Sequence, residues 1–301
     1  MLPYALALTL FGAALAADPQ PAKGWQEDLK EAIARIDRNT AGELGVYLKR
    51  RGDQNGLSHR AEQMWYLSST TKVPVAIAVL QAVEADELSL DEELTLRESD
   101  YVDGAGDLLW EQPGSRHSIA DLLERMLVDS DSTATDMLIR HLGEDELNRH
   151  IRTEIAPEGF SAITTILQVR YDAYAELHPD SAQLSNMDIV HLHSSAQGEE
   201  RLDGLLEQLS VTPEHLQATS IDEAFERYYQ RGLNSGTLEA FGELLERLID
   251  GDLLTPEHTA RMLEHMQNVT TGEDRIQAGL PPGTPFAQKP APKSGAPATS
   301  A

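Results

Sequence analysis

The sequence predicts an α+β fold, with an antiparallel sheet flanked by helices and an additional helical subdomain. Short apolar stretches at 44–48 and 64–67 have the length and composition of strands. A Ser/Thr cluster at 68–71 leads into a long apolar run that is typical of a buried helix. Most of the later chain has helical periodicity, which predicts that the first strands precede a largely helical region.

The N-terminal residues 1–16 have the pattern of a secretory signal. An apolar run, short for a membrane span, ends in the small-x-small site Ala14-Leu15-Ala16. We therefore expect cleavage before Ala17, a periplasmic or secreted protein, and a single domain over residues 17–301. No Lys or Arg precedes the apolar run, and an uncleaved membrane anchor is the alternative.

The remaining elements follow in chain order. A helix is expected over 25–36 because its apolar residues recur on one face. The strand 44–48 comes next, with 64–67 as its expected neighbour, and then a helix from Ser69 to about Ala85. A helical subdomain is expected over about 69–220. The further segments with helical periodicity are 118–127, 132–142, 145–152, 235–250 and 256–267.

The composition restricts the classes of partner. The chain has 301 residues and a formal net charge of −26, from 50 acidic and 24 basic residues. So strong a negative charge argues against nucleic acid or an anionic membrane surface as a partner. The sequence contains no cysteine, which excludes a disulfide, a thiolate nucleophile and a Cys-based metal site.

Ser69 and Lys72 form the first candidate catalytic pair. They lie three residues apart at the start of a predicted helix, so both side chains share one face about one turn apart. A helix N-terminus favours an oxyanion, and a partly desolvated lysine can lose its proton and deprotonate a serine. Ordinary capping by the serine beside a solvated lysine is the alternative. No other lysine of the chain follows a serine at this spacing.

The second motif is Ser130-Asp131-Ser132, between the helices expected at 118–127 and 132–142. A turn of this composition that only caps a helix is the alternative. The pair Ser99-Asp100 shows how readily such a pattern arises. The apolar and hydroxyl-rich sequence on both sides of Ser130 favours a functional role.

With these two motifs the chain resembles the class A β-lactamase-related serine hydrolases of the β-lactamase/D,D-peptidase superfamily, over roughly residues 25–289. The resemblance implies that Ser69 is the acylated nucleophile and that Lys72 accepts its proton. It implies that Ser130 passes the proton to the leaving nitrogen, that Asp131 holds the loop, and that Ser132 binds the substrate where the family usually has Asn. It also implies a monomer, a small-molecule substrate, and no metal or other cofactor.

The loop that carries the deacylation base departs from the family. The usual Glu-x-x-Leu-Asn motif, aligned on Leu177, puts Tyr174 at the Glu position and His178 at the Asn position. Glu176 lies two residues from the Glu position, where a solvated surface carboxylate is the simpler interpretation. Asp172 and His178 are the other candidates for a base.

The third family motif, Lys-Thr-Gly on a sheet strand, starts at Lys289, to which the resemblance assigns substrate binding. The chain then continues as a Pro- and Ala-rich stretch, which predicts an aberrant disordered tail over 290–301. A single deleted base in a frame encoding Lys-Thr-Gly-Thr-Gln-Val would produce this tail. We therefore expect a frameshift at Lys289, missing C-terminal strands, and a strand 44–48 without its main partner. The nucleotide sequence around Lys289 tests this.

Three functions are compatible with these features. The first is a serine hydrolase that opens β-lactam rings through a Ser69 acyl-enzyme. The second is a peptidoglycan D,D-peptidase or esterase with the same Ser69–Lys72–Ser130 chemistry, acting on a D-Ala-D-Ala-type peptide, which the missing loop Glu favours. The third is an inactive β-lactam-binding remnant, because the third motif is interrupted.

Overall fold

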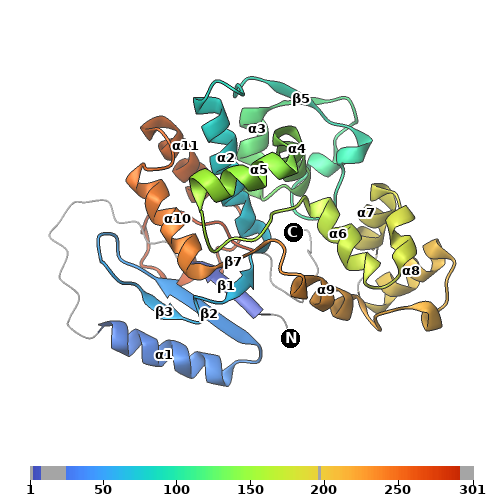
Figure 1. Ribbon diagram of the computed structural model, residues 1–301, viewed down its shortest axis with the longest axis horizontal. Coiled ribbons are helices and arrows are strands. Elements are labelled where there is room, and N and C mark those ends of the chain that lie inside the picture. The colour runs from blue at the N-terminus through green and yellow to red at the C-terminus, as the bar shows by residue number, and fades with distance from the viewer. Residues whose placement is uncertain (1–2, 8–24, 196–197, 292–301) are drawn as a thin grey trace.

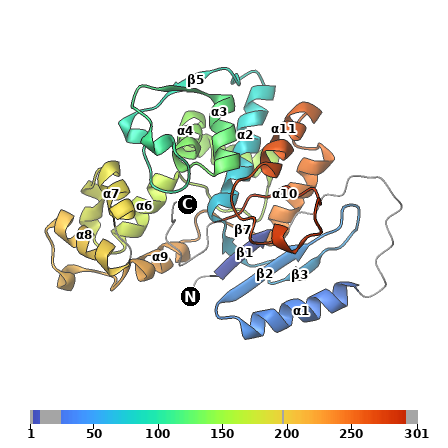
Figure 2. The ribbon, with the colours of Figure 1, turned by 180° about the vertical axis from the view of Figure 1, so that it is seen from behind.

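The computed structural model describes residues 3–7, 25–195 and 198–291 (Figure 1). Most of the predicted signal 1–16 and all but two residues of the predicted tail 290–301 lie outside the described residues. The α+β class is confirmed. A small sheet lies at one side of the molecule, helices surround a central helix, and a further group of helices lies beyond them (Figures 1 and 2).

The main sheet has three strands in the order β1-β2-β3. The strand β2 (Glu43–Leu48) lies in the centre, parallel to β1 (Pro3–Ala7) and antiparallel to β3 (Leu57–His59). In this structure residues 3–7 form a strand along the edge of β2, so β2 is paired on both sides. Cleavage before Ala17 would remove this strand, and the expected loss of C-terminal partners stays a prediction.

The predicted pairing of 64–67 with 44–48 is also wrong. The strand β4 (Met64–Tyr66) pairs antiparallel with β7 (Ser235–Thr237), with Trp65 opposite Gly236. Residues 235–237, predicted as the first turn of a helix, are thus a strand. Trp65 is 1% exposed and packs against Tyr47 of the main sheet and Leu238, which directly follows β7. Because β4 and β7 are far apart along the chain, local periodicity does not reveal their pairing.

Two helices cover the main sheet. The helix α1 (Trp25–Asn39) packs Ile33 against Val46 and Leu57. The helix α10 (Leu238–Asp250) contacts β2 from the opposite side (Figure 1). Burial of these apolar side chains between the layers stabilises the sheet.

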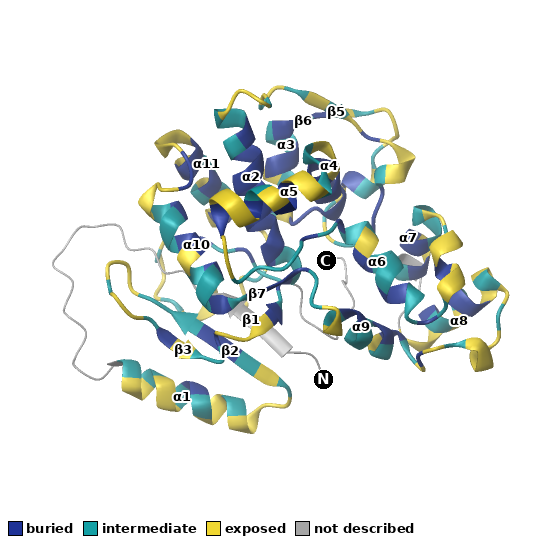
Figure 3. Ribbon diagram, in the orientation of Figure 1, coloured by how far each residue is buried: buried dark blue, intermediate teal, exposed yellow. Residues whose placement is uncertain are grey.

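The central helix α2 (Lys72–Glu84) is buried along almost its whole length (Figure 3). Apolar residues surround it on all sides, which is the pattern of a core helix. Its neighbours in the core are α3 (Ile119–Glu124), α4 (Ser132–Leu142), α5 (Glu144–His150), α10 and α11 (Pro256–Gln267). A small two-stranded sheet, β5 (Glu93–Thr95) with β6 (Arg116–Ser118), lies beside them.

A second helical group has its own apolar cluster, which includes Tyr174, Leu177 and Ile189. Sequence periodicity did not identify these helices, and the segment 171–178, predicted as a loop, is mostly helical. Thr165 caps the first of them, because its side chain accepts a hydrogen bond from the Gln168 N–H. The group consists of α6 (Ile166–Ala175), α7 (Asn186–Ser195), α8 (Glu199–Leu209) and α9 (Ile221–Gln230). Among the described residues, no helix is both long and apolar enough to cross a membrane.

Candidate active site

A cavity of about 260 Å³ lies where α2, α4 and α6 approach one another. The described residues that line it include Ser69, Lys72, Ser130 and Ser132, so the fold brings four of the sequence-predicted site residues together. No Asp or Glu side chain is among the described residues of its lining. The part of the chain that the structure describes also contains no cluster of three or more His, Asp or Glu side chains that could hold a metal ion.

The ammonium group of Lys72 connects the two candidate hydroxyls. Its Nζ lies 3.4 Å from Ser69 Oγ and 3.0 Å from Ser130 Oγ, and it donates a further hydrogen bond of 2.5 Å to the Ser130 carbonyl oxygen. The lysine is 1% exposed. Burial lowers the pKa of Lys72 to about 8, although the charges of Asp131 and Asp136 oppose this shift.

Local backbone structure places these two serines. Ser69 lies in a short 3-10 helix (Ser68–Thr71) directly before α2, where the chain leaves β4. Ser130 follows a π-helical turn (Arg125–Asp129) and adopts the left-handed conformation, with φ of 61°. This turn directs the Ser130 side chain back toward Lys72, since both its carbonyl and its hydroxyl reach the ammonium group.

Asp131 and Ser132 hold the loop 104–108 against the start of α4. The Asp131 carboxylate accepts hydrogen bonds from the Ala134 N–H (2.8 Å) and the Leu108 N–H (3.0 Å), so it caps α4 and holds the 104–108 segment. The Ser132 N–H donates to the Ala105 carbonyl oxygen. Two glycines allow this approach: a Cβ on Gly104 would lie 2.4 Å from Ser132 Oγ, and one on Gly106 would lie 2.1 Å from Asp131 Oδ2.

Lys289 is close to the site but does not line the cavity. Its Nζ donates to the carbonyl oxygens of Met126 (3.0 Å) and Leu127 (2.8 Å), and its side chain is buried. Burial, followed by the charge of Lys72, lowers the pKa of Lys289 well below its usual value. Pro290 and Ala291, expected to belong to a disordered tail, instead form part of the cavity wall.

The sequence-based placement of the loop base is wrong. Tyr174 is 1% exposed within the second apolar cluster and does not line the cavity. Glu176 follows the end of α6 and does not line the cavity either, and Asp172 is engaged with Gln168 and Arg231. The alignment on Leu177 assumed a loop, whereas the segment is helical and turns these residues to other surroundings.

The residues of α6 that do line the cavity are Ile166, Val169 and Arg170. The buried Asp136 carboxylate holds the start of this helix, accepting hydrogen bonds from the Ile166 N–H (2.7 Å) and the Leu167 N–H (2.9 Å). Burial raises the pKa of Asp136 to about 6. Ile166 therefore has a fixed backbone position and presents an apolar side chain to the cavity.

Arg170 was not identified from the sequence, because its partner is distant along the chain. It pairs with Asp103, whose side chain is 3% exposed. Burial alone would raise the pKa of Asp103, but Arg170 and His193 lower it to about 2. The local sequence around either residue carries no signal of this contact.

Known proteins share the family pattern and the fold of this chain. The sequence pattern of the family described as "Beta-lactamase enzyme family" matches residues 28–295. A β-lactamase of Rhodobacter capsulatus is 33% identical over 142 residues, which are 47% of this chain and 46% of that protein. The matched region is thus about half of that relative's length.

Solved structures also resemble the chain. A β-lactamase from Xanthomonas campestris has a TM-score of 0.60 at 23% identity, covering 86% of this chain and 76% of that one. The L158E mutant of PBP-A, an acyl-enzyme complex with penicillin-G, has a TM-score of 0.59 at 21% identity, covering 85% and 74%. At these identities the structures show a shared fold, and the family match extends over most of the sequence. The chain therefore belongs to the beta-lactamase enzyme family.

Proposed function

We propose that the chain is a serine hydrolase that opens β-lactam rings through an acyl-enzyme at Ser69. The observation that carries this proposal is the position of the Lys72 ammonium group between Ser69 Oγ and Ser130 Oγ. A lysine that bridges two hydroxyls can take a proton from one and return it through the other.

The proposed acylation step uses three side chains. Neutral Lys72 accepts the Ser69 proton while Ser69 Oγ attacks the lactam carbonyl carbon. The C–N bond of the ring then breaks, and the nitrogen receives a proton from Ser130, which Lys72 reprotonates. Ser132 and Lys289 are proposed to assist substrate binding. The position of Ser132 in the cavity wall supports this more directly than that of Lys289, whose ammonium group faces carbonyl oxygens.

The acylation rate is expected to depend on the protonation state of Lys72. Because only the neutral amine accepts a proton, the rate should rise about tenfold per pH unit below the pKa of about 8 and level off above it. The measurement is the acylation rate constant by stopped flow between pH 6 and 10. A Lys72→Ala chain should acylate about 10²–10⁴ times more slowly, and its rate should not rise with pH in this way. If the acylation rate of that variant still rises with pH below about 8, another group is the base.

A second candidate function is a peptidoglycan D,D-peptidase or esterase. It is favoured by the absence of any carboxylate among the described residues of the cavity lining. Hydrolysis of an acyl-enzyme needs a base to deprotonate water, and Ile166 cannot supply one. The same site would then form an acyl-enzyme from a D-Ala-D-Ala-type peptide and react slowly with β-lactams. Comparing release of D-alanine with β-lactam turnover distinguishes the two.

We also propose that the protein is exported and acts as a monomer. The apolar run before Ala17 supports export. N-terminal sequencing of protein recovered outside the cytoplasm is expected to start at Ala17, and a sequence that starts at Met1 would contradict cleavage. Sedimentation or light scattering is expected to give the mass of one chain.

A further inference from the structure

Arg170 is held rigidly by two residues from other elements. Its Nε donates to both carboxylate oxygens of Asp103, at 2.9 and 2.8 Å. His193 on α7 approaches the same carboxylate, with Nδ1 3.0 Å from Asp103 Oδ2. Because Asp103 is almost completely buried, the Arg170 side chain has one well-defined orientation.

The Arg170 side chain also reaches the cavity. The Arg170 side chain is 18% exposed and lines the cavity together with Ser69 and Lys72. Its two terminal NH₂ groups make no hydrogen bond to any described residue, although Nε is fully engaged. The Cζ atom lies 5.9 Å from the centre of the Phe225 ring, which supports the flat face of the group.

The two lysines near the cavity are already engaged. Lys72 contacts Ser69 and Ser130, and Lys289 donates to two carbonyl oxygens. Arg275, which also lines the cavity, donates through Nη1 to the Ala291 carbonyl oxygen, while its buried Nε has no hydrogen-bond partner among the described residues. No carboxylate lines the cavity within the described residues, despite the strongly acidic chain. An anionic group that enters the cavity therefore meets a preorganised guanidinium fork with free donors, which matches the geometry of a carboxylate.

We propose that Arg170 is a specificity-determining residue that binds a carboxylate on the acyl part of the substrate. This inference rests on the proposed acylation of Ser69. The leaving nitrogen must approach Ser130, which has no contact with Arg170, so the group near α6 belongs to the part that remains esterified. The preferred substrates are β-lactams or peptides whose acyl side chain carries a free carboxylate.

Two penicillins provide a matched test. Carbenicillin differs from benzylpenicillin by one carboxylate on the side-chain carbon next to the amide carbonyl. The second-order rate constant for acylation of Ser69 is measured for both by mass spectrometry. In Arg170→Gln the carbenicillin-to-benzylpenicillin ratio is expected to fall about tenfold to a hundredfold. Arg170→Lys, which keeps the charge but not the fork, should retain part of the preference.

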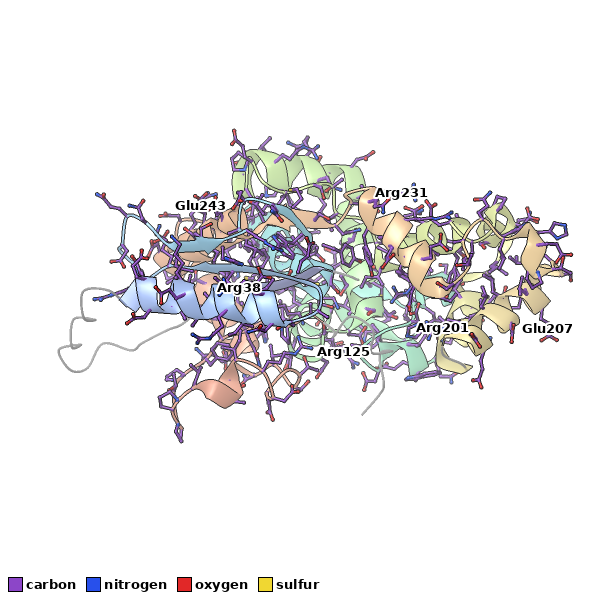
Figure 4. All side chains as sticks on the ribbon, turned by 90° about the horizontal axis from the view of Figure 1, so that it is seen from below. Arg38, Arg125, Arg201, Glu207, Arg231 and Glu243 are labelled. Carbon is purple, nitrogen blue, oxygen red and sulfur yellow. The ribbon has the colours of Figure 1, made fainter. Side chains whose placement is uncertain are left out.

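The controls separate recognition from folding. Arg231→Gln removes the same charge just after the end of α9 (Figure 4), outside the cavity lining, and should leave the ratio unchanged. The double variant Arg170→Gln/Asp103→Asn avoids a buried unpaired carboxylate and should show the same loss as Arg170→Gln. Both penicillins are measured on one sample, so an unfolded fraction cancels from the ratio.

Two outcomes would overturn the inference. If Arg170→Gln slows acylation by both penicillins equally, Arg170 does not bind the side-chain carboxylate, and the proposed function stands. If neither penicillin acylates the parent chain, the proposed function fails and this inference fails with it.

Discussion

A Ser69→Ala chain is expected to form no covalent adduct with a fluorescent penicillin or in intact-mass spectra. The reason is that Ser69 Oγ is the hydroxyl that both reaches Lys72 and lies at the entrance to α2. The measurement compares labelling of the parent chain, of Ser69→Ala, and of a form in which the frame after Lys289 encodes Thr-Gly-Thr. The family that the sequence resembles implies that the Lys-Thr-Gly strand supplies one backbone donor to the oxyanion. The form with Thr-Gly-Thr is therefore expected to label about 10²–10³ times faster, the usual effect of one oxyanion-hole donor.

The matched control for this experiment is Ser68→Ala. Ser68 is adjacent, also lines the cavity, and has a left-handed φ of 49°. This conformation is unfavourable for serine and alanine alike, because both have a Cβ. Labelling should persist in this variant. An adduct that forms on Ser69→Ala, located by peptide mapping to Ser68 or Ser130, would show that the nucleophile has been misassigned.

An Ile166→Glu chain is expected to hydrolyse its acyl-enzyme about 10²–10⁴ times faster than the parent chain, the usual contribution of a general base. Asp136 fixes the backbone at Ile166, and the Ile166 side chain lines the cavity beside Ser69 and Lys72. A carboxylate introduced there could deprotonate a water molecule near the ester. Stopped flow with a chromogenic cephalosporin should show a burst and slow turnover in the parent chain and faster steady turnover in the variant.

Tyr174→Glu is the informative comparison. Sequence alignment alone places the base at Tyr174, but that side chain lies in a buried apolar cluster away from the cavity. A carboxylate buried there without a partner should lower the melting temperature and leave deacylation unchanged. Faster deacylation in Tyr174→Glu, with none in Ile166→Glu, would support the sequence-based placement against the structure.

The features that sequence analysis predicted correctly are local ones. The α+β class follows from strand-like segments followed by helical periodicity, and the family from a resemblance carried by two short motifs. The face shared by Ser69 and Lys72 follows from their spacing of three residues. The errors concern contacts between distant segments. The pairing of β4 with β7 and the contact of Arg170 with Asp103 depend on how the chain folds back, and neither leaves a periodic pattern in either segment.

The missed helices have a related cause. The helix α6 has apolar and polar residues on several faces, since one side lines the cavity, another meets Asp103, and a third packs in the second cluster. A helix with three different neighbours has no single apolar face for periodicity to reveal. Aligning the segment on Leu177 therefore placed the base position at Tyr174, which does not line the cavity, whereas Ile166 does.

The two glycines beside the Ser130 loop limit which positions can accept substitutions when variants are selected for new substrates. Gly104 and Gly106 have φ values of +135° and +93°, and neither has room for a Cβ against Ser132 or Asp131. Selection for a broader substrate range should therefore retain both glycines and accumulate changes elsewhere on the cavity wall. Pro290 and Ala291, which no regular element constrains, are the positions where adaptive diversity should concentrate.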